Sequence, residues 1–131
     1  KFTVHPRHIE RPVTGLGKKY RSAVDPRARV WQLSLGEQQR VEILKALYRE
    51  ARILILDEPT AVLTPQESES LFETLRAMAA EGRTVIFISH NLGDIFAVAD
   101  RILVLRRGVK AGERRIGETG GDAIVKLRVG G

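Results

Sequence analysis

The stretch ILILDEPT, residues 53–60, decides the fold: four apolar residues in a row are followed by two acids and a proline. A continuous apolar run of this length predicts a strand covered on both faces, as in a parallel sheet. Ligands of open α/β sheets bind beyond the carboxyl ends of the strands, which is where Asp57 and Glu58 follow. One carboxylate there can orient Mg²⁺ through its water shell while the other takes a proton from an attacking water. An ordinary strand that ends in solvated acidic residues explains the same sequence equally well.

Helices and strands are expected to alternate on either side of this strand. A helix is predicted from Ser34 to Arg49, because apolar residues recur there at helical spacing. A second helix begins with Thr64 as N-cap and Glu67 closing a capping box, and it ends at Gly82. Further expected elements are strands at 84–89 and 101–105 and a short helix at 92–99. Short crossovers of this kind predict an α/β fold in which flanking helices cover one parallel sheet.

Composition divides the 131 residues into three parts. Residues 1–29 hold three of the five prolines and show no sustained hydrophobic period. Residues 30–110 carry the strong patterning, and residues 111–131 are expected to form a hairpin and a frayed tail. The sequence has no cysteine and no apolar run of the ~20 residues that a membrane-spanning helix needs. It therefore offers no disulfide framework, no thiolate zinc site and no inserted helix.

A second informative segment is LSLGEQQR, residues 33–40, which places a hydroxyl residue and a glycine at the head of a helix. Free backbone N–H groups and the positive end of the helix dipole meet there, which favours an anion such as phosphate. Ser34 adds a side-chain donor, and Gly36 lets the backbone approach a ligand closely. A serine N-cap with a polar first turn is the common alternative. That alternative leaves unexplained why an acid-tipped strand follows so closely.

A third segment is ISH, residues 88–90, at the carboxyl end of the second expected strand. A histidine in this place can contact a terminal phosphate and sense its presence. A lone histidine is more often structural or merely exposed. The hypothesis that His90 contacts phosphate is therefore supported only by the presence of the other two segments.

These three segments, in this order and spacing, resemble the ATP-binding subunit of ABC transporters across about residues 16–110. The first resembles the ABC signature, the second a Walker B strand running into the D-loop, and the third the switch histidine. Residues 36–67 are similar to ATPases of importers for simple sugars or nucleosides, in particular to the first of their two ABC domains. In that comparison residues 1–29 belong to a helical subdomain.

The resemblance implies a role for each matching position. Asp57 would hold the Mg²⁺ shell, Glu58 would polarise the attacking water, and His90 would contact the γ-phosphate. Contacts to the γ-phosphate of ATP held by a second ABC domain would come from Ser34, Gly36, Glu37 and Gln38. Residues 61–64 would cross the interface between the two domains. Leu35 and Glu37 depart from the commonest signature, but both variants occur in the sugar-type branch.

One expected motif is missing from the sequence. No G-x-x-x-x-G-K-[ST] is present, and the nearest approach, residues 15–19, lacks its first glycine and the final hydroxyl residue. The chain therefore resembles the C-terminal half of a cassette without Walker A. Because the phosphate cradle and its lysine hold ATP in this class, the isolated chain is expected to bind ATP weakly and hydrolyse it negligibly.

The resulting expectation is the ATP-hydrolysing component of an importer, cytoplasmic and peripheral on the inner face of the membrane. Its expected partners are a second ABC domain and membrane permease subunits. The missing P-loop favours a non-catalytic interaction module instead, whereas the intact acids and histidine favour the ATPase. An ABC-type ATPase acting on nucleic acid is the third hypothesis, suggested by a net charge of +6. The basic residues are interleaved with acids and few aromatics, which favours a solvated surface and no nucleic-acid partner.

Overall fold

The computed structural model describes Arg29 and residues 33–130. It divides after Ile88 into two compact units, which are described one at a time. Predictions that fall on residues 1–28 and 30–32, including the helical subdomain, lie outside the described residues. Within the described ranges, no helix is long and apolar enough to cross a membrane.

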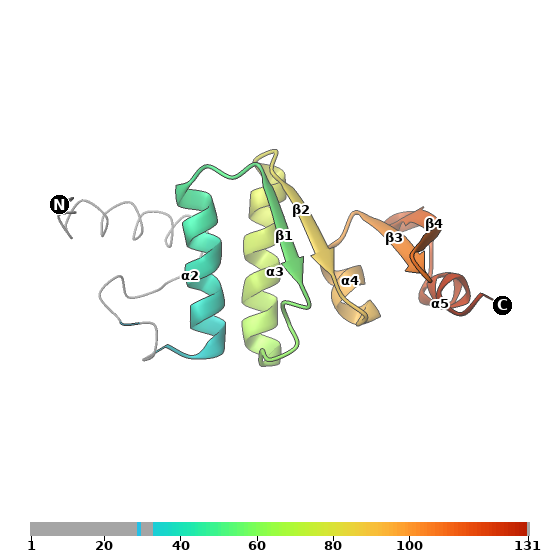
Figure 1. The fold of residues 1–131 in the computed structure, drawn as a ribbon, viewed down its shortest axis with the longest axis horizontal. Helices are drawn as coiled ribbons and strands as arrows, with labels where there is room; N and C mark the ends of the chain where they lie inside the picture. Colours follow the sequence, from blue (N-terminus) through green and yellow to red (C-terminus); the bar gives the residue numbers. More distant parts are fainter. Residues whose placement is uncertain (1–28, 30–32, 131) are drawn as a thin grey trace. The chain divides into compact units, whose positions relative to one another are not determined.

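The first unit is a βαβ arrangement preceded by a helix (Figure 1). Strands β1 (Ile53–Asp57) and β2 (Thr84–Ile88) pair in parallel, and α3 (Pro65–Ala80) connects them. The register sets Ile53 opposite Thr84 and Asp57 opposite Ile88. The predicted parallel pairing of these two strands is therefore confirmed, and the end of β1 lies beside the end of β2.

Only one face of this strand pair is covered by described residues. The rings of Phe72 on α3 and Phe87 on β2 meet edge to face, with centroids 6.0 Å apart. Residues of β1 and β2 alternate between half-buried and exposed, and Ile53 and Ile55 are 60% and 62% exposed. For the described residues the expectation of strands covered on both faces is wrong, because α3 packs on one face while Ile53 and Ile55 on the other remain largely exposed.

The two helices of the first unit begin as predicted. Helix α2 (Leu35–Tyr48) has Ser34 as its N-cap, and Glu37 completes a capping box. Helix α3 starts at Thr64 in the same way, with Glu67 as the returning carboxylate. The helical spacing of apolar residues predicted from the sequence is seen in the buried side chains of both helices. The buried residues are Gly36, Ile43, Leu44 and Leu47 on α2, and Leu71, Phe72, Thr74, Leu75 and Met78 on α3.

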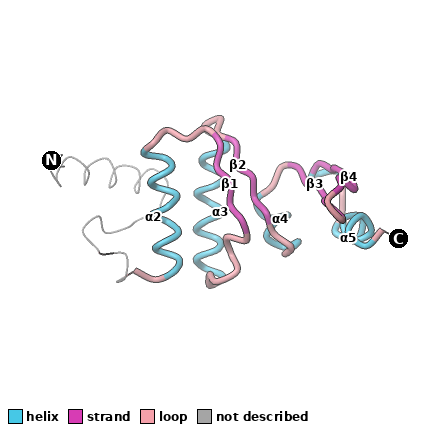
Figure 2. The backbone as a smooth tube through the Cα atoms, viewed as in Figure 1, coloured by secondary structure: helices cyan, strands magenta, loops and turns pink. Residues whose placement is uncertain are grey.

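The second unit contains α4 (Leu92–Val98), β3 (Arg101–Arg106), β4 (Val109–Arg115), a short 3-10 turn (Ile116–Glu118) and α5 (Gly121–Val129), which Figure 2 colours by type. The strand expected to extend the parallel sheet instead pairs antiparallel with β4. The physical reason is the tight turn at Arg107 and Gly108, whose φ angles of 51° and 75° suit a two-residue hairpin. The prediction that residues 101–105 extend the parallel sheet is therefore wrong, because β3 forms the first strand of an antiparallel hairpin.

The C-terminal residues are more ordered than the sequence suggested. Residues 121–129 form α5 where a frayed tail was expected. Ile124 is 1% exposed and packs with Ile102 and Val104 of β3, and Leu127 packs against the same cluster. Two apolar residues at helical spacing thus give this glycine-flanked segment an apolar face to bury.

Candidate functional site

The head of α2 satisfies several of its own polar groups. The Ser34 N–H donates to Glu37 Oε2 at 2.7 Å, and the Glu37 N–H donates to Ser34 Oγ at 3.2 Å. The Gln38 side chain donates to the Leu33 carbonyl at 3.2 Å. Ser34 is exposed, while Glu37 and Gln38 are partly buried. Three of the four residues predicted to contact phosphate therefore also hold the helix start in shape.

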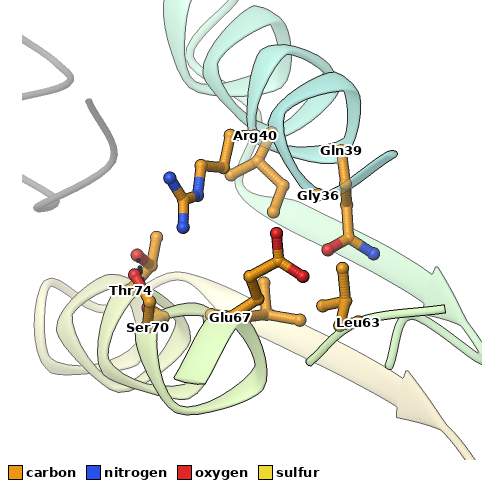
Figure 3. A pocket seen from close by; sticks show the side chains of 9 residues that line it. Gly36, Gln39, Arg40, Leu63, Glu67, Ser70 and Thr74 are labelled. Atoms are coloured by element: carbon orange, nitrogen blue, oxygen red, sulfur yellow. Dashed lines mark hydrogen bonds between the residues drawn. The ribbon is translucent and has the colours of Figure 1, made fainter. Parts of the chain in front are cut away.

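The fourth, Gly36, is buried against α3. A Cβ at Gly36 would lie 2.7 Å from Glu67 Oε1 and 3.3 Å from Leu63 Cδ2. Figure 3 shows the Glu67 carboxylate directed from α3 towards α2, between the two helices. A side chain at position 36 would therefore require the Glu67 carboxylate to shift, whatever ligand the backbone meets.

The acid tip of β1 turns sharply out of the sheet. Asp57 is exposed and Glu58 is partly buried. Glu58 has a φ of 47°, a left-handed conformation that costs a non-glycine residue about 1–2 kcal/mol. Its N–H donates to the Ile88 carbonyl at the end of β2, at 2.8 Å. The neighbouring strand β2 thus holds the backbone at Glu58 by a hydrogen bond.

A side-chain contact that the sequence did not predict joins this turn to α2. Gln39 Nε2 donates to the carbonyl of buried Pro59 at 2.6 Å, across twenty residues of chain. The capping pattern of Glu67 was legible in the sequence, but its approach to Gly36 was not. Both contacts depend on how α2 packs against segments distant in sequence, the turn after β1 and the start of α3.

His90 belongs to the second unit, in which it directly precedes Asn91, the N-cap of α4. Its side chain is exposed, and its carbonyl accepts a hydrogen bond from Arg128 at 3.3 Å. Ser89 Oγ accepts from the Asn91 N–H at 3.0 Å. The structure thus gathers the predicted residues of α2 and β1 in the first unit and gives His90 a place in the other.

The carboxylates at the end of β1 fit one kind of metal better than others. No group of three or more His, Cys, Asp or Glu side chains in the described part of the chain could hold a metal by itself. Mg²⁺ suits this limited set, because it keeps several waters and takes one or two carboxylates together with substrate phosphates. Asp57, exposed at the strand end, can serve as such a ligand.

Comparisons with known proteins give a consistent result. A family profile described as "ABC transporter" matches residues 6–61. The glucose import ATP-binding protein TsgD13 of Haloferax volcanii is 46% identical over 121 residues, which make up 92% of this chain and 22% of the relative. The ribose import ATP-binding protein RbsA of Hahella chejuensis is 50% identical over 107 residues, 82% of this chain and 21% of the relative.

The third relative is a nucleoside importer protein. NupA of Lactococcus lactis subsp. cremoris is 45% identical over 121 residues, 92% of this chain and 24% of the relative. The chain thus spans about a fifth to a quarter of the length of these curated relatives. Since the matches span 82% or more of the chain, each must include residues 33–90, where the three motif segments lie.

Solved structures agree on the fold. The dimeric cassette MJ0796, a bacterial ABC transporter cassette, matches with a TM-score of 0.71 and 23% identity, over 88% of this chain and 50% of that one. A putative metal-chelate type ABC transporter matches with a TM-score of 0.80 and 18% identity, over 99% of this chain and 52% of that one. At these identities the likeness shows the α/β cassette fold alone, which was the predicted fold class.

Proposed function

We propose that the chain is part of an ATP-binding protein of the ABC transporter family, the family of its relatives, and that it supplies part of a composite ATP site in an importer for a simple sugar or nucleoside. One observation carries the proposal: the matches at 45–50% identity include both the head of α2 and the acid tip of β1. The first unit supports it by joining these two segments directly through Gln39 and Pro59.

In the proposed mechanism a water attacks the γ-phosphate of ATP in line with the leaving group. Glu58 lies beside Asp57 at the end of β1 and takes the proton of that water. Asp57 would hold Mg²⁺ through its water shell, and the ion would supply positive charge that offsets the charge of the phosphates. The head of α2 adds Ser34, Gly36, Glu37 and Gln38 as contacts to a γ-phosphate held by a second ABC domain. His90 contacts the same phosphate from the start of the second unit.

The partners proposed for the chain follow from this division of labour. A second ABC domain supplies the phosphate cradle opposite the head of α2, and permease subunits transmit the energy of hydrolysis. The chain works on the cytoplasmic side, peripheral on the inner face of the membrane. Because its sequence contains no Walker A motif, the isolated chain binds ATP weakly and turns it over negligibly.

The test is a graft into a relative. The 107-residue matching segment of RbsA from Hahella chejuensis is replaced by the corresponding residues of this chain, and ATP hydrolysis is measured. The graft should hydrolyse ATP, and Glu58→Gln should lower the turnover number by a factor on the order of 10² or more, as expected for loss of a general base. Glu69→Gln is the matched control, since Glu69 lies exposed on α3 and pairs with Arg76. A well-folded graft whose hydrolysis is indifferent to Glu58→Gln would contradict the proposal.

A non-catalytic interaction module is the second candidate. The observation that favours it is an apolar face of β1 and β2 that remains exposed in the described part of the chain and includes Ile53 and Ile55. An isolated apolar surface of this kind is typical of a region that another protein segment covers. The same graft decides between the two, because a module predicts no dependence of hydrolysis on Glu58.

A further inference from the structure

We infer that Gln39 is a positioning residue for Glu58: it holds the turn that presents this carboxylate, without touching the reacting atoms itself. The inference deepens the proposed function and rests on it for its catalytic meaning. Its structural part stands on contacts within the first unit alone. Those contacts come from three different elements that meet at the end of β1.

The backbone around Glu58 is held on both sides. On the N-terminal side of the Glu58 Cα, the Glu58 N–H donates to the Ile88 carbonyl at 2.8 Å. On the C-terminal side, the carbonyl of the next residue, Pro59, accepts a hydrogen bond from Gln39 Nε2 at 2.6 Å. The left-handed conformation between these bonds, with φ at 47°, persists only where surrounding structure fixes it. Strand β2 supplies one fixed point, and α2 supplies the other.

The second fixed point is supported by the close approach of the first turn of α2 to α3. Gly36, one turn before Gln39, admits the Glu67 side chain so closely that a Cβ would lie 2.7 Å from Glu67 Oε1. Glu67 Oε2 in turn accepts from the Thr64 N–H at 2.9 Å. These contacts position the first turns of α2 against the start of α3. They thereby help to hold Gln39 within hydrogen-bond distance of the Pro59 carbonyl.

Among the described residues, the donor to the Pro59 carbonyl is Gln39 Nε2, so the carbonyl loses this bond if Gln39 loses its amide. Pro59 is buried, so an unpaired carbonyl there would be costly, and the turn would rearrange to find a partner. The residue next to it is Glu58. A shift of an ångström at that carboxylate is enough to lower the rate of a reaction that depends on an aligned water.

The structural part is tested on the whole chain by amide hydrogen exchange. Gln39→Met keeps the side-chain length and removes the donor. It should speed exchange of the Glu58 amide on the order of tenfold, the size expected for a lost hydrogen bond with a buried acceptor. Glu42→Met is the matched control on the same helix, because Glu42 is exposed and pairs only locally with Lys45 at 3.1 Å. Gln39→Lys retains a donor and should leave the Glu58 exchange rate within about twofold of the native rate.

The catalytic part is tested in the RbsA graft by kinetics. Gln39→Met should lower kcat at least about tenfold and leave KM for ATP within about twofold, because the donor acts on the turn and not on the nucleotide. Gln39→Glu is the second loss variant if Gln39→Met folds poorly, since a carboxylate cannot donate to Pro59. Unchanged Glu58 exchange in both loss variants, or equal kcat in the native and loss-variant grafts, overturns the inference. Hydrolysis indifferent to Glu58→Gln overturns the proposed function instead, and the exchange data still show whether Gln39 holds the turn.

Discussion

Gly36→Ala should have opposite effects on stability depending on whether residue 67 carries a carboxylate. In the native chain the new Cβ would lie 2.7 Å from Glu67 Oε1 and 2.9 Å from Glu67 Cδ, so the carboxylate must move. Moving it sacrifices the bond from the Thr64 N–H to Glu67 Oε2, which is 2.9 Å long. Loss of such a cap costs about 1 kcal/mol of the free energy of unfolding.

Two terms therefore compete at Gly36. Alanine is the better helix former by about 0.5–1 kcal/mol, which offsets part of the lost cap. We expect Gly36→Ala alone to lower the free energy of unfolding by at most about 0.5 kcal/mol, the difference between these two terms. In a Glu67→Ala background the obstacle is gone, and the same change should raise the free energy of unfolding by about 0.5–1 kcal/mol.

The measurement is a double-mutant cycle from urea denaturation of the four chains. The coupling between positions 36 and 67 should be about 1 kcal/mol or more, a size that residues in contact reach. A Glu69→Ala background provides the control, because Glu69 is exposed on the same helix and takes no part in the contact with α2. Effects that add to within about 0.3 kcal/mol would refute the packing argument for Gly36.

The remaining predictions concern backbone strain and one ion cluster. Glu50 and Gly82 each follow the C-cap of a helix, with φ angles of 57° and 87°, respectively. Glycine adopts this conformation without strain. In urea denaturation, Glu50→Gly should therefore raise the free energy of unfolding by about 1 kcal/mol, and Gly82→Ala should lower it by about the same amount. Arg107→Asn should raise the thermal midpoint by a few degrees, because Asn tolerates the left-handed hairpin position with φ of 51° better than Arg. The hydrogen bond and charge of Lys110 hold the pKa of Glu113 below its usual value of 4.5, so the stability it contributes is present above that pH and is lost as the pH falls. Glu113→Gln should therefore flatten the fall in the urea midpoint between about pH 5 and pH 3; an equally steep fall in the variant would contradict this.

The features that the sequence predicted correctly are those whose causes lie within a few residues. The capping boxes at Ser34 and Thr64 each depend on a glutamate three positions later, so the helix starts are legible in the sequence. The parallel pairing of β1 and β2 follows from two apolar runs joined by one helix. These local signals also led to the acid tip of β1.

The incorrect predictions depend on which distant segment an element meets. Strand β3 resembles an inner strand by itself, but its partner β4 reads VKAGERR, in which few residues favour strands. Coverage of β1 depends on what packs against its second face, which an apolar run does not specify. The bond from Gln39 to Pro59 joins residues twenty positions apart, and no local pattern marks either end.

Backbone strain separates the turn at Glu58 from the others in the molecule. Among the described residues, three that are not glycine have positive φ: Glu50, Glu58 and Arg107. Glu50 and Arg107 lie at a helix end and a hairpin turn, where glycine or asparagine would relieve the strain at no cost to any contact described above. The carbonyl after Glu50 also accepts a side-chain hydrogen bond, from Arg83, but the Glu50 N–H bonds back to its own helix. Glu58 differs because its own N–H bonds to the neighbouring strand β2, while Gln39 holds the carbonyl that follows. Strain that neighbouring elements maintain is typical of functional sites, so this geometry favours a role for the Glu58 carboxylate itself over a role as a solvated strand end.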